Sequence, residues 1–382
     1  MSDSAASYIS AALSAAPPEL RPIVQDLQRL YDRKLWHQLT LALFKFLDHP
    51  LSQPYRVDLF NQFVKHFEDK INPLRLAEMC VATSKSIEEP DKLLVFLTTV
   101  LARIPASKAP EANVLLLSSI AHAKLLFGDM DGTKVDLGVA GRLLDDLSDV
   151  ESSVRAAYYS VAADYFKAKA DYVPYYKHSL LYLACVNVET DLTGEEKIAR
   201  AHDLSISALL GDTLYNFGEL LMHPILASLD GSAHEWIKSL LFTFNEGNIG
   251  KFEALSPQFP REPILQENYP FLRQKICLMA LIEAAFKRGI NGRTMSFQTI
   301  AEETKLPHDE VEHLVMKALS LHLIRGTLDQ VSSTAHISWV QPRVLSRQQI
   351  GELAVRLGGW CEKLQKTENF VKDNQPELFA GL

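Results

Sequence analysis

The chain has 382 residues, of which 47% are hydrophobic and 23% are charged, and its formal net charge is −8. This composition excludes wholesale disorder, and the length is sufficient for two or three domains with a substantial core. The negative net charge argues against nucleic acid or an anionic membrane as the main partner.

The first twenty residues are rich in alanine and serine but lack the basic and strongly apolar segments of a signal peptide. We therefore expect residues 1–20 to form a flexible N-terminal arm. The longest uncharged apolar runs, at 93–102 and 112–123, are shorter than the roughly 18 residues that a membrane-spanning helix needs. This pattern predicts a soluble protein with no membrane contact.

Residues 21–175 are predicted to form a succession of amphipathic helices without a strand, beginning with 21–30, 36–47 and 57–70. Asn72 followed by Pro73 is typical of a helix start. The stretch AHAKLLFGD at 121–129 has the ending of the first helix in tetratricopeptide-like (TPR-like) pairs, and 158–171 with 172–186 forms another such pair. These pairs favour an all-α-dominated fold that begins with an irregular TPR-like α-solenoid.

Residues 176–345 are predicted to form a second domain, which begins with helices over 195–255 interrupted at Gly211, His223 and Asp230. The proline-rich segment 255–270 is expected to be a stiff connector. An apolar helix is predicted at 271–286, and a turn at 289–292 follows it.

Two helices and a hairpin are predicted within 296–340. Ser296 is a good N-cap for a short amphipathic helix, and a second helix starts at Pro307 with acids in its first turn. Strands are predicted at 323–328 and 335–340. On the second strand two sets of residues alternate, namely Ala335, Ile337 and Trp339 with His336, Ser338 and Val340. This order predicts a winged-helix module over about 271–345.

A winged helix invites a nucleic-acid-binding interpretation, which the charge of its second helix tests. The residues expected to face outward are Asp309, Glu310, Glu312, His313, Met316, Lys317 and Ser320. Three acidic side chains against one lysine would repel phosphate. The outward residues also include no Arg, Asn or Gln that could read the edges of DNA bases. We expect this helix to contact protein rather than DNA or RNA. A basic patch formed in three dimensions would instead favour nucleic-acid binding.

A final helix is predicted at 346–371, within a C-terminal segment 346–382 that ends in a frayed tail. Its apolar residues follow a three-four spacing over three heptads: Ile350, Leu353, Leu357, Trp360, Leu364 and Val371. These residues are the predicted partner-binding seam. The alternative is a helix that packs back on its own domain.

Known catalytic and metal-binding motifs do not occur in the sequence. The twelve histidines never form HExxH, HxH or an i, i+4 pair, and neither a phosphate-binding loop nor GxSxG is found. Adjacent pairs such as His202–Asp203 and His234–Glu235 are interpreted as solvated helix faces. The cysteines Cys80, Cys185, Cys277 and Cys361 are expected to be small buried side chains in a reducing compartment. We therefore expect no catalytic, cofactor or metal site.

Four unbroken strings carry a resemblance to a known family: KLWHQLT at 34–40, NFGELLMHPIL at 216–226, LVMKALS at 314–320 and WVQPRVL at 339–345. They resemble the PCI family, whose members build the proteasome lid, the signalosome and translation initiation factor three. Within that family the chain looks most like the lid subunits.

The resemblance implies a non-catalytic scaffold subunit in the lid of the proteasome regulatory particle, supporting assembly and ATP-dependent degradation of ubiquitinated proteins in cytoplasm and nucleus. Family members form hetero-oligomers, in which winged helices pair edge to edge and C-terminal helices join one bundle. The corresponding wing-strand residues here are Ala335, His336, Ile337, Ser338 and Trp339. A scaffold of another PCI complex, and a winged-helix adaptor for nucleic acid, remain alternatives.

Overall fold

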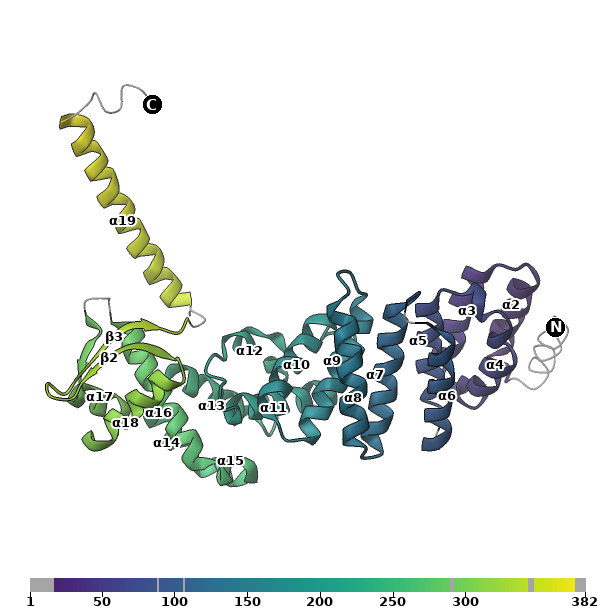
Figure 1. Ribbon diagram of the computed structural model, residues 1–382, viewed down its shortest axis with the longest axis horizontal. Coiled ribbons are helices and arrows are strands. Elements are labelled where there is room, and N and C mark those ends of the chain that lie inside the picture. The colour runs from purple at the N-terminus through teal and green to yellow at the C-terminus, as the bar shows by residue number, and fades with distance from the viewer. Residues whose placement is uncertain (1–16, 88, 106, 289–291, 343–346, 375–382) are drawn as a thin grey trace. The chain divides into compact units, whose positions relative to one another are not determined.

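The computed structural model describes residues 17–87, 89–105, 107–288, 292–342 and 347–374 (Figure 1). The chain divides into two compact units, Met1–Thr193 and Gly194–Leu382. Helices dominate both, and the described residues include one three-stranded sheet, in the second unit. The predicted all-α-dominated class is therefore confirmed.

The first unit is a stack of helices whose neighbours in sequence are neighbours in space. Within it α7 packs against α8 and α9, α9 against α10, and α2 against α3. The helices are α2 (Arg21–Asp32), α3 (Trp36–Asp48), α4 (Arg56–Gln62), α5 (Pro73–Ser84), α6 (Pro90–Arg103), α7 (Pro110–Leu126), α8 (Met130–Asp145), α9 (Ser152–Ala168) and α10 (Tyr172–Cys185). The expected domain boundary between residues 175 and 176 falls inside α10. The first compact unit ends later, at Thr193.

Local signals at helix ends behave as predicted. Asn72 caps α5, because its side-chain oxygen accepts a hydrogen bond from the Leu74 amide at 2.9 Å, and Pro73 occupies the first helical position. In the second unit, the Ser296 hydroxyl accepts a hydrogen bond from the Thr299 amide at 3.2 Å. These caps need only neighbouring residues, so the sequence suffices to find them.

The single helix expected at 57–70 is wrong. The chain instead forms α4, a short 3₁₀ turn η2 (Val64–His66) and another, η3 (Glu68–Lys70). The break lies at Phe63, whose ring contacts Tyr31 at 5.1 Å and Phe67 at 5.0 Å between centroids. Phe67 in turn stacks on Trp36. Burial of this aromatic cluster outweighs the hydrogen bonds of a continuous helix.

The structure also differs from two expectations about burial, one for the N-terminal arm and one for the cysteines. The arm expected at 1–20 lies mostly outside the described residues, but Leu20 is completely buried and belongs to the core of the first unit. Cys80 and Cys277 are buried as expected, and burial raises the pKa of the Cys277 thiol to about 11. Cys361 is exposed, because the helix that carries it is uncovered.

The second unit begins with α11 (Gly194–Leu210), α12 (Gly218–Met222), the 3₁₀ turn η4 (Pro224–Leu229), α13 (Glu235–Glu246), α14 (Ile249–Leu255), the 3₁₀ turn η5 (Ser256–Arg261), α15 (Pro263–Glu267) and α16 (Tyr269–Lys287). The segment 255–270 is not a bare connector. Its side chains Phe259 and Leu265 are buried, and the Phe259 ring contacts Phe252 and Trp236. This segment is therefore part of the core.

A buried lysine joins α11 to α16. The Lys275 ammonium donates hydrogen bonds to three carbonyl oxygens at the C-terminal end of α11: Ala208 at 2.9 Å and Leu209 at 2.9 Å in its last turn, and Gly211 at 2.6 Å directly after it. Three aromatic rings surround it, those of Tyr215, Phe217 and Phe271. The lysine satisfies carbonyls that a helix end leaves unpaired. Burial lowers the pKa of Lys275 to about 7, and Asp212 partly opposes that shift.

The winged helix consists of β1 (Thr294–Ser296), α17 (Phe297–Thr304), α18 (His308–Ser320), β2 (Ile324–Asp329) and β3 (Thr334–Val340). The sheet is antiparallel in the order β1-β3-β2. The sequence interpretation missed β1, and the expected wing strand β3 is therefore the central strand rather than an edge.

A bulge changes the alternation along β3. The register pairs Arg325 with Trp339 and Gly326 with Ile337, so Ser338 is left over between them. Val340 consequently turns inward and is buried, although the sequence pattern placed it on the polar face. The last helix, α19 (Arg347–Asn374), follows the sheet. Among the described residues, no helix is both long enough and apolar enough to cross a membrane.

Candidate subunit interface

The helix α19 leaves its apolar seam uncovered. The exposed fractions are 53% for Ile350, 44% for Leu353, 51% for Leu357, 65% for Trp360 and 69% for Leu364. Val371, the last seam residue, is half-buried. Because large apolar side chains are normally buried in a core, a helix with five exposed ones on one side is a strong candidate for an interface.

Two exposed apolar residues of α19 lie outside the predicted seam. Val355 is 76% exposed and Phe370 is 66% exposed. At 100° per residue they lie on the side of the helix opposite Leu357. The three-four spacing concealed them, since neither continues it. With apolar residues on both sides, α19 suits a position among several helices better than contact with one flat surface.

Of the five predicted wing-strand residues, two are buried, two are exposed and one, Trp339, is half-buried. Ala335 and Ile337 are buried, with 1% and 2% exposed, so they serve the core of the chain itself. His336 and Ser338 are exposed, and their side chains bond within the sheet: His336 Nδ1 lies 2.8 Å from the Thr294 hydroxyl.

Trp339 is half-buried, because the guanidinium of Arg325 lies 4.8 Å from its ring centre. Since β3 pairs on both sides, it cannot accept a further strand. The edge strands of this sheet are β1 and β2, and a further strand can pair along β2.

The second helix of the winged helix, α18, presents an acidic surface. Asp309, Glu310 and His313 are exposed, while Glu312 is half-buried and accepts a hydrogen bond from Gln330. Lys317 is half-buried and donates to Gln274. The exposed side of α18 is thus unsuited to phosphate, as its sequence predicted.

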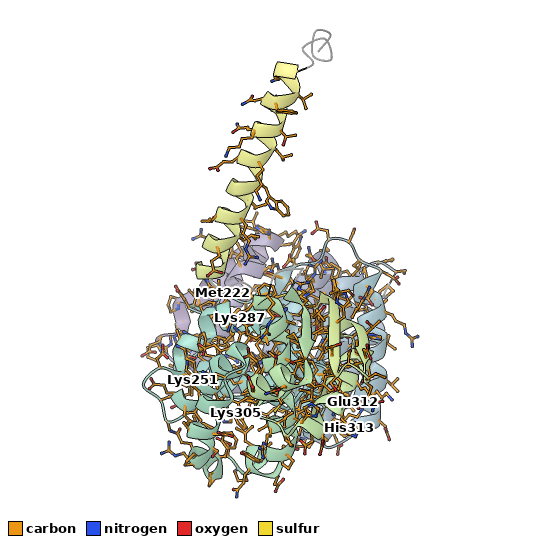
Figure 2. The ribbon with its side chains drawn as sticks, turned by 90° about the vertical axis from the view of Figure 1, so that its left-hand side faces the viewer. Met222, Lys251, Lys287, Lys305, Glu312 and His313 are labelled. Carbon is orange, nitrogen blue, oxygen red and sulfur yellow. The ribbon has the colours of Figure 1, made fainter. Side chains whose placement is uncertain are left out.

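Three lysines elsewhere in the second unit do not compensate for this acidity. The three labelled in Figure 2 each lie beside a glutamate: Lys251 Nζ is 2.7 Å from Glu246, Lys287 Nζ 3.6 Å from Glu283, and Lys305 Nζ 3.7 Å from Glu253. Paired lysines attract a polyanion much less than a row of unpaired ones. These three lysines therefore do not form the basic patch that would favour nucleic-acid binding.

Comparison with known proteins agrees with this architecture. The family described as PSD13 N-terminal repeats matches residues 23–241, and the family described as PCI domain matches residues 252–339. The chain belongs to the PSD13 family of PCI-domain proteins. The resemblance to the PCI family found in the sequence is confirmed, and the second match covers the winged helix described above.

Relatives of this family align along nearly the whole chain. The probable 26S proteasome regulatory subunit rpn9 of Schizosaccharomyces pombe is 40% identical, over 100% of this chain and 99% of its own length. The 26S proteasome non-ATPase regulatory subunit 13 homolog B of Arabidopsis thaliana is also 40% identical, over 96% and 97%. The 26S proteasome regulatory subunit RPN9 of Saccharomyces cerevisiae is 40% identical over 92% of each chain.

Proposed function

We propose that this PSD13-family chain is a non-catalytic scaffold subunit of the lid of the proteasome regulatory particle. In this role it joins sister PCI subunits in a hetero-oligomer and supports the ATP-dependent degradation of ubiquitinated proteins. The observation that carries the proposal is the uncovered apolar seam of α19, in a chain whose full-length relatives are named proteasome regulatory subunits.

The seam supports a bundle of helices as its partner. Between its apolar positions α19 carries charges of both signs: Glu352, Arg356, Glu362, Lys363 and Lys366. In helical bundles such flanking residues form ion pairs that select partner and orientation, while the seam supplies the affinity. Ile350, Leu353, Leu357, Trp360, Leu364 and Val371 would be the anchors, and Val355 and Phe370 would contact a further helix.

The winged helix offers a second contact. We infer that a neighbouring subunit extends the sheet along β2, with the exposed side chains His336 and Ser338 and the Arg325–Trp339 pair at its border. Ala335 and Ile337 would act indirectly, by holding β3 in place. Both contacts are between proteins, and the proposal includes no cofactor, membrane or nucleic-acid partner. Cytoplasm and nucleus are the compartments that this role implies.

Native affinity purification of the tagged full-length protein tests the proposal. We expect other lid subunits and the base subunits to co-purify, together with ATP-dependent peptidase activity. Recovery of signalosome subunits or of translation initiation factor three would keep the PCI scaffold and reject the proteasome. Recovery of nucleic acid that is lost at moderate salt would instead support the winged-helix adaptor.

A further inference from the structure

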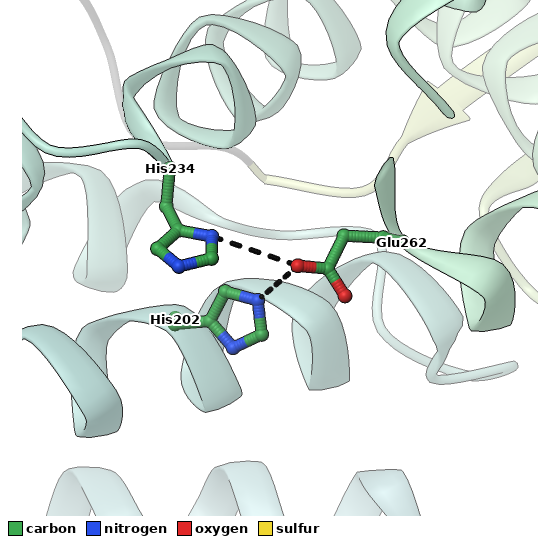
Figure 3. A group of neighbouring side chains, drawn as sticks. All are labelled: His202, His234 and Glu262. Atoms are coloured by element: carbon green, nitrogen blue, oxygen red, sulfur yellow. Dashed lines mark hydrogen bonds and ion pairs between the residues drawn. The ribbon is translucent and has the colours of Figure 1, made fainter. Parts of the chain in front are cut away.

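Three side chains far apart in the sequence meet in the second unit: His202, His234 and Glu262 (Figure 3). His202 lies on α11, His234 is the residue before α13, and Glu262 lies between η5 and α15. The cluster therefore connects three separate segments of the helical part of this unit.

The donor atoms are arranged around a common point. Glu262 Oε1 lies 2.9 Å from His202 Nε2 and 3.5 Å from His234 Nδ1. One donor atom from each residue lies within 4.8 Å of the other two. Around a tetrahedral zinc ion with bonds of about 2.0–2.1 Å, neighbouring ligand atoms are about 3.3 Å apart. Small side-chain rotations would bring all three to that spacing.

The two histidines are prepared for a ligand in different ways. His202 Nδ1 faces the Asp203 carboxylate at 3.5 Å. A carboxylate at one ring nitrogen orients the ring and turns the other nitrogen toward a metal, an arrangement common behind metal-binding histidines. His234 Nδ1 is buried and makes no hydrogen bond among the described residues, since its 3.5 Å contact with Glu262 Oε1 lacks hydrogen-bond geometry. A buried polar atom left in this way is costly, and coordination would satisfy it.

Charge and access also suit a cation. Glu262 and Asp203 supply two negative charges around two imidazoles, which balances one divalent ion. The side chains are partly open to solvent, with 21% of His202, 36% of His234 and 19% of Glu262 exposed. Solvent can therefore deliver the ion and fill a fourth coordination position with water.

We propose that His202 Nε2, His234 Nδ1 and the Glu262 carboxylate bind a divalent transition-metal ion of the zinc class. The bound ion cross-links α11, the start of α13 and the η5–α15 segment, and so stabilises the helical part that precedes the winged helix. The donor set is imidazole and carboxylate without thiolate, which favours zinc over softer ions. This role is independent of the proteasome assignment.

Metal binding by the untagged full-length protein tests the proposal, because a histidine tag would itself bind zinc. After chelator treatment and dialysis, zinc chloride is titrated against a chromophoric chelator, and retained metal is measured by mass spectrometry. We expect one Zn²⁺ per chain and a higher Tm with zinc than without. Co²⁺ at the same site should give the intense visible absorption of a tetrahedral complex.

Variants locate the site. His234→Ala and Glu262→Gln should each weaken zinc binding by about tenfold or more and abolish the cobalt absorption. His313→Ala, which removes an exposed histidine of α18 in the same unit, should leave both unchanged. Glu262→Gln keeps the side-chain shape, and circular dichroism verifies its fold. The proposal is overturned if the wild-type chain retains no zinc, or if its affinity is equal in the two cluster variants and the wild type.

Discussion

Replacing Leu357 and Trp360 together by aspartate tests the interface assignment of α19 most directly. In the isolated chain these side chains are 51% and 65% exposed, so the substitutions remove little from the core of the subunit. They place two carboxylates in the middle of the apolar seam. We expect the variant to fold normally and to fail to join the regulatory particle.

The exposed areas set the size of the effect. Complete burial of a leucine side chain is worth about 1.5–3 kcal/mol, so the exposed half of Leu357 offers a partner about 1 kcal/mol. An aromatic side chain of this kind buries up to about 250 Å². The 65% of Trp360 that remains exposed is then worth about 4 kcal/mol at about 25 cal/mol per Å². Losing about 5 kcal/mol weakens association by more than about a thousandfold.

A matched variant controls for added charge. Gln25→Asp with Gln38→Asp introduces two aspartates at exposed positions of α2 and α3, so the same negative charge is added outside α19. Each variant replaces the natural copy in cells, and quantitative mass spectrometry measures the proteasome subunits that co-purify with it. Circular dichroism and thermal unfolding of the purified chains verify the fold.

We expect the seam variant to lose at least about 90% of the co-purifying subunits, because its affinity for them falls steeply. The control variant should recover them normally. Normal recovery of the proteasome subunits with the seam variant would show that α19 is not an anchoring element. Equal loss with the control would mean that the added negative charge, and not the apolar seam, accounts for the effect.

Three other substitutions test the fold. Gly247→Ala should lower the free energy of unfolding by about 2 kcal/mol or more in urea, because Gly247 has φ +65° and an added Cβ would lie 2.8 Å from Ala280 Cα. Gly326→Ala should accelerate amide exchange along β2 and β3, since its Cβ would lie 2.0 Å from the His336 carbonyl oxygen; unchanged protection would contradict the register. Lys275→Met should cost about 3 kcal/mol at neutral pH, because three buried carbonyls lose their donor. The lowered pKa of Lys275 means that the unfolded chain binds more protons between pH 7 and 10.5, so wild-type stability should rise by about 2 kcal/mol from pH 7 to 9 relative to Lys275→Met. A parallel pH dependence in both chains would contradict this assignment.

The sequence was most informative where a few neighbouring residues decide the structure. Asn72–Pro73 and Ser296 start helices through hydrogen bonds to amides two or three residues away. The seam of α19 is a property of one helix, so its spacing could be found without a partner. Four unbroken strings were sufficient to place the chain in the PCI family, and the matches along the chain bear this out.

Long-range contacts explain what the sequence analysis missed. The strand β1 is three residues long and is recognised only by its pairing with β3, more than thirty residues later. That pairing converts the expected edge strand into the central one. Phe63 interrupts a helical pattern because its ring meets Tyr31 from another helix.

The caps of α5 and α17, the acidic side of α18 and the seam of α19 were therefore determined by the sequence alone, because each depends on residues within a few turns of one another. The tertiary structure decided which of these residues remain exposed. It buried Ala335 and Ile337, left Leu357 and Trp360 uncovered, and brought His202, His234 and Glu262 from three segments to one point. Such contacts depend on how distant segments pack, and no local spacing encodes that packing.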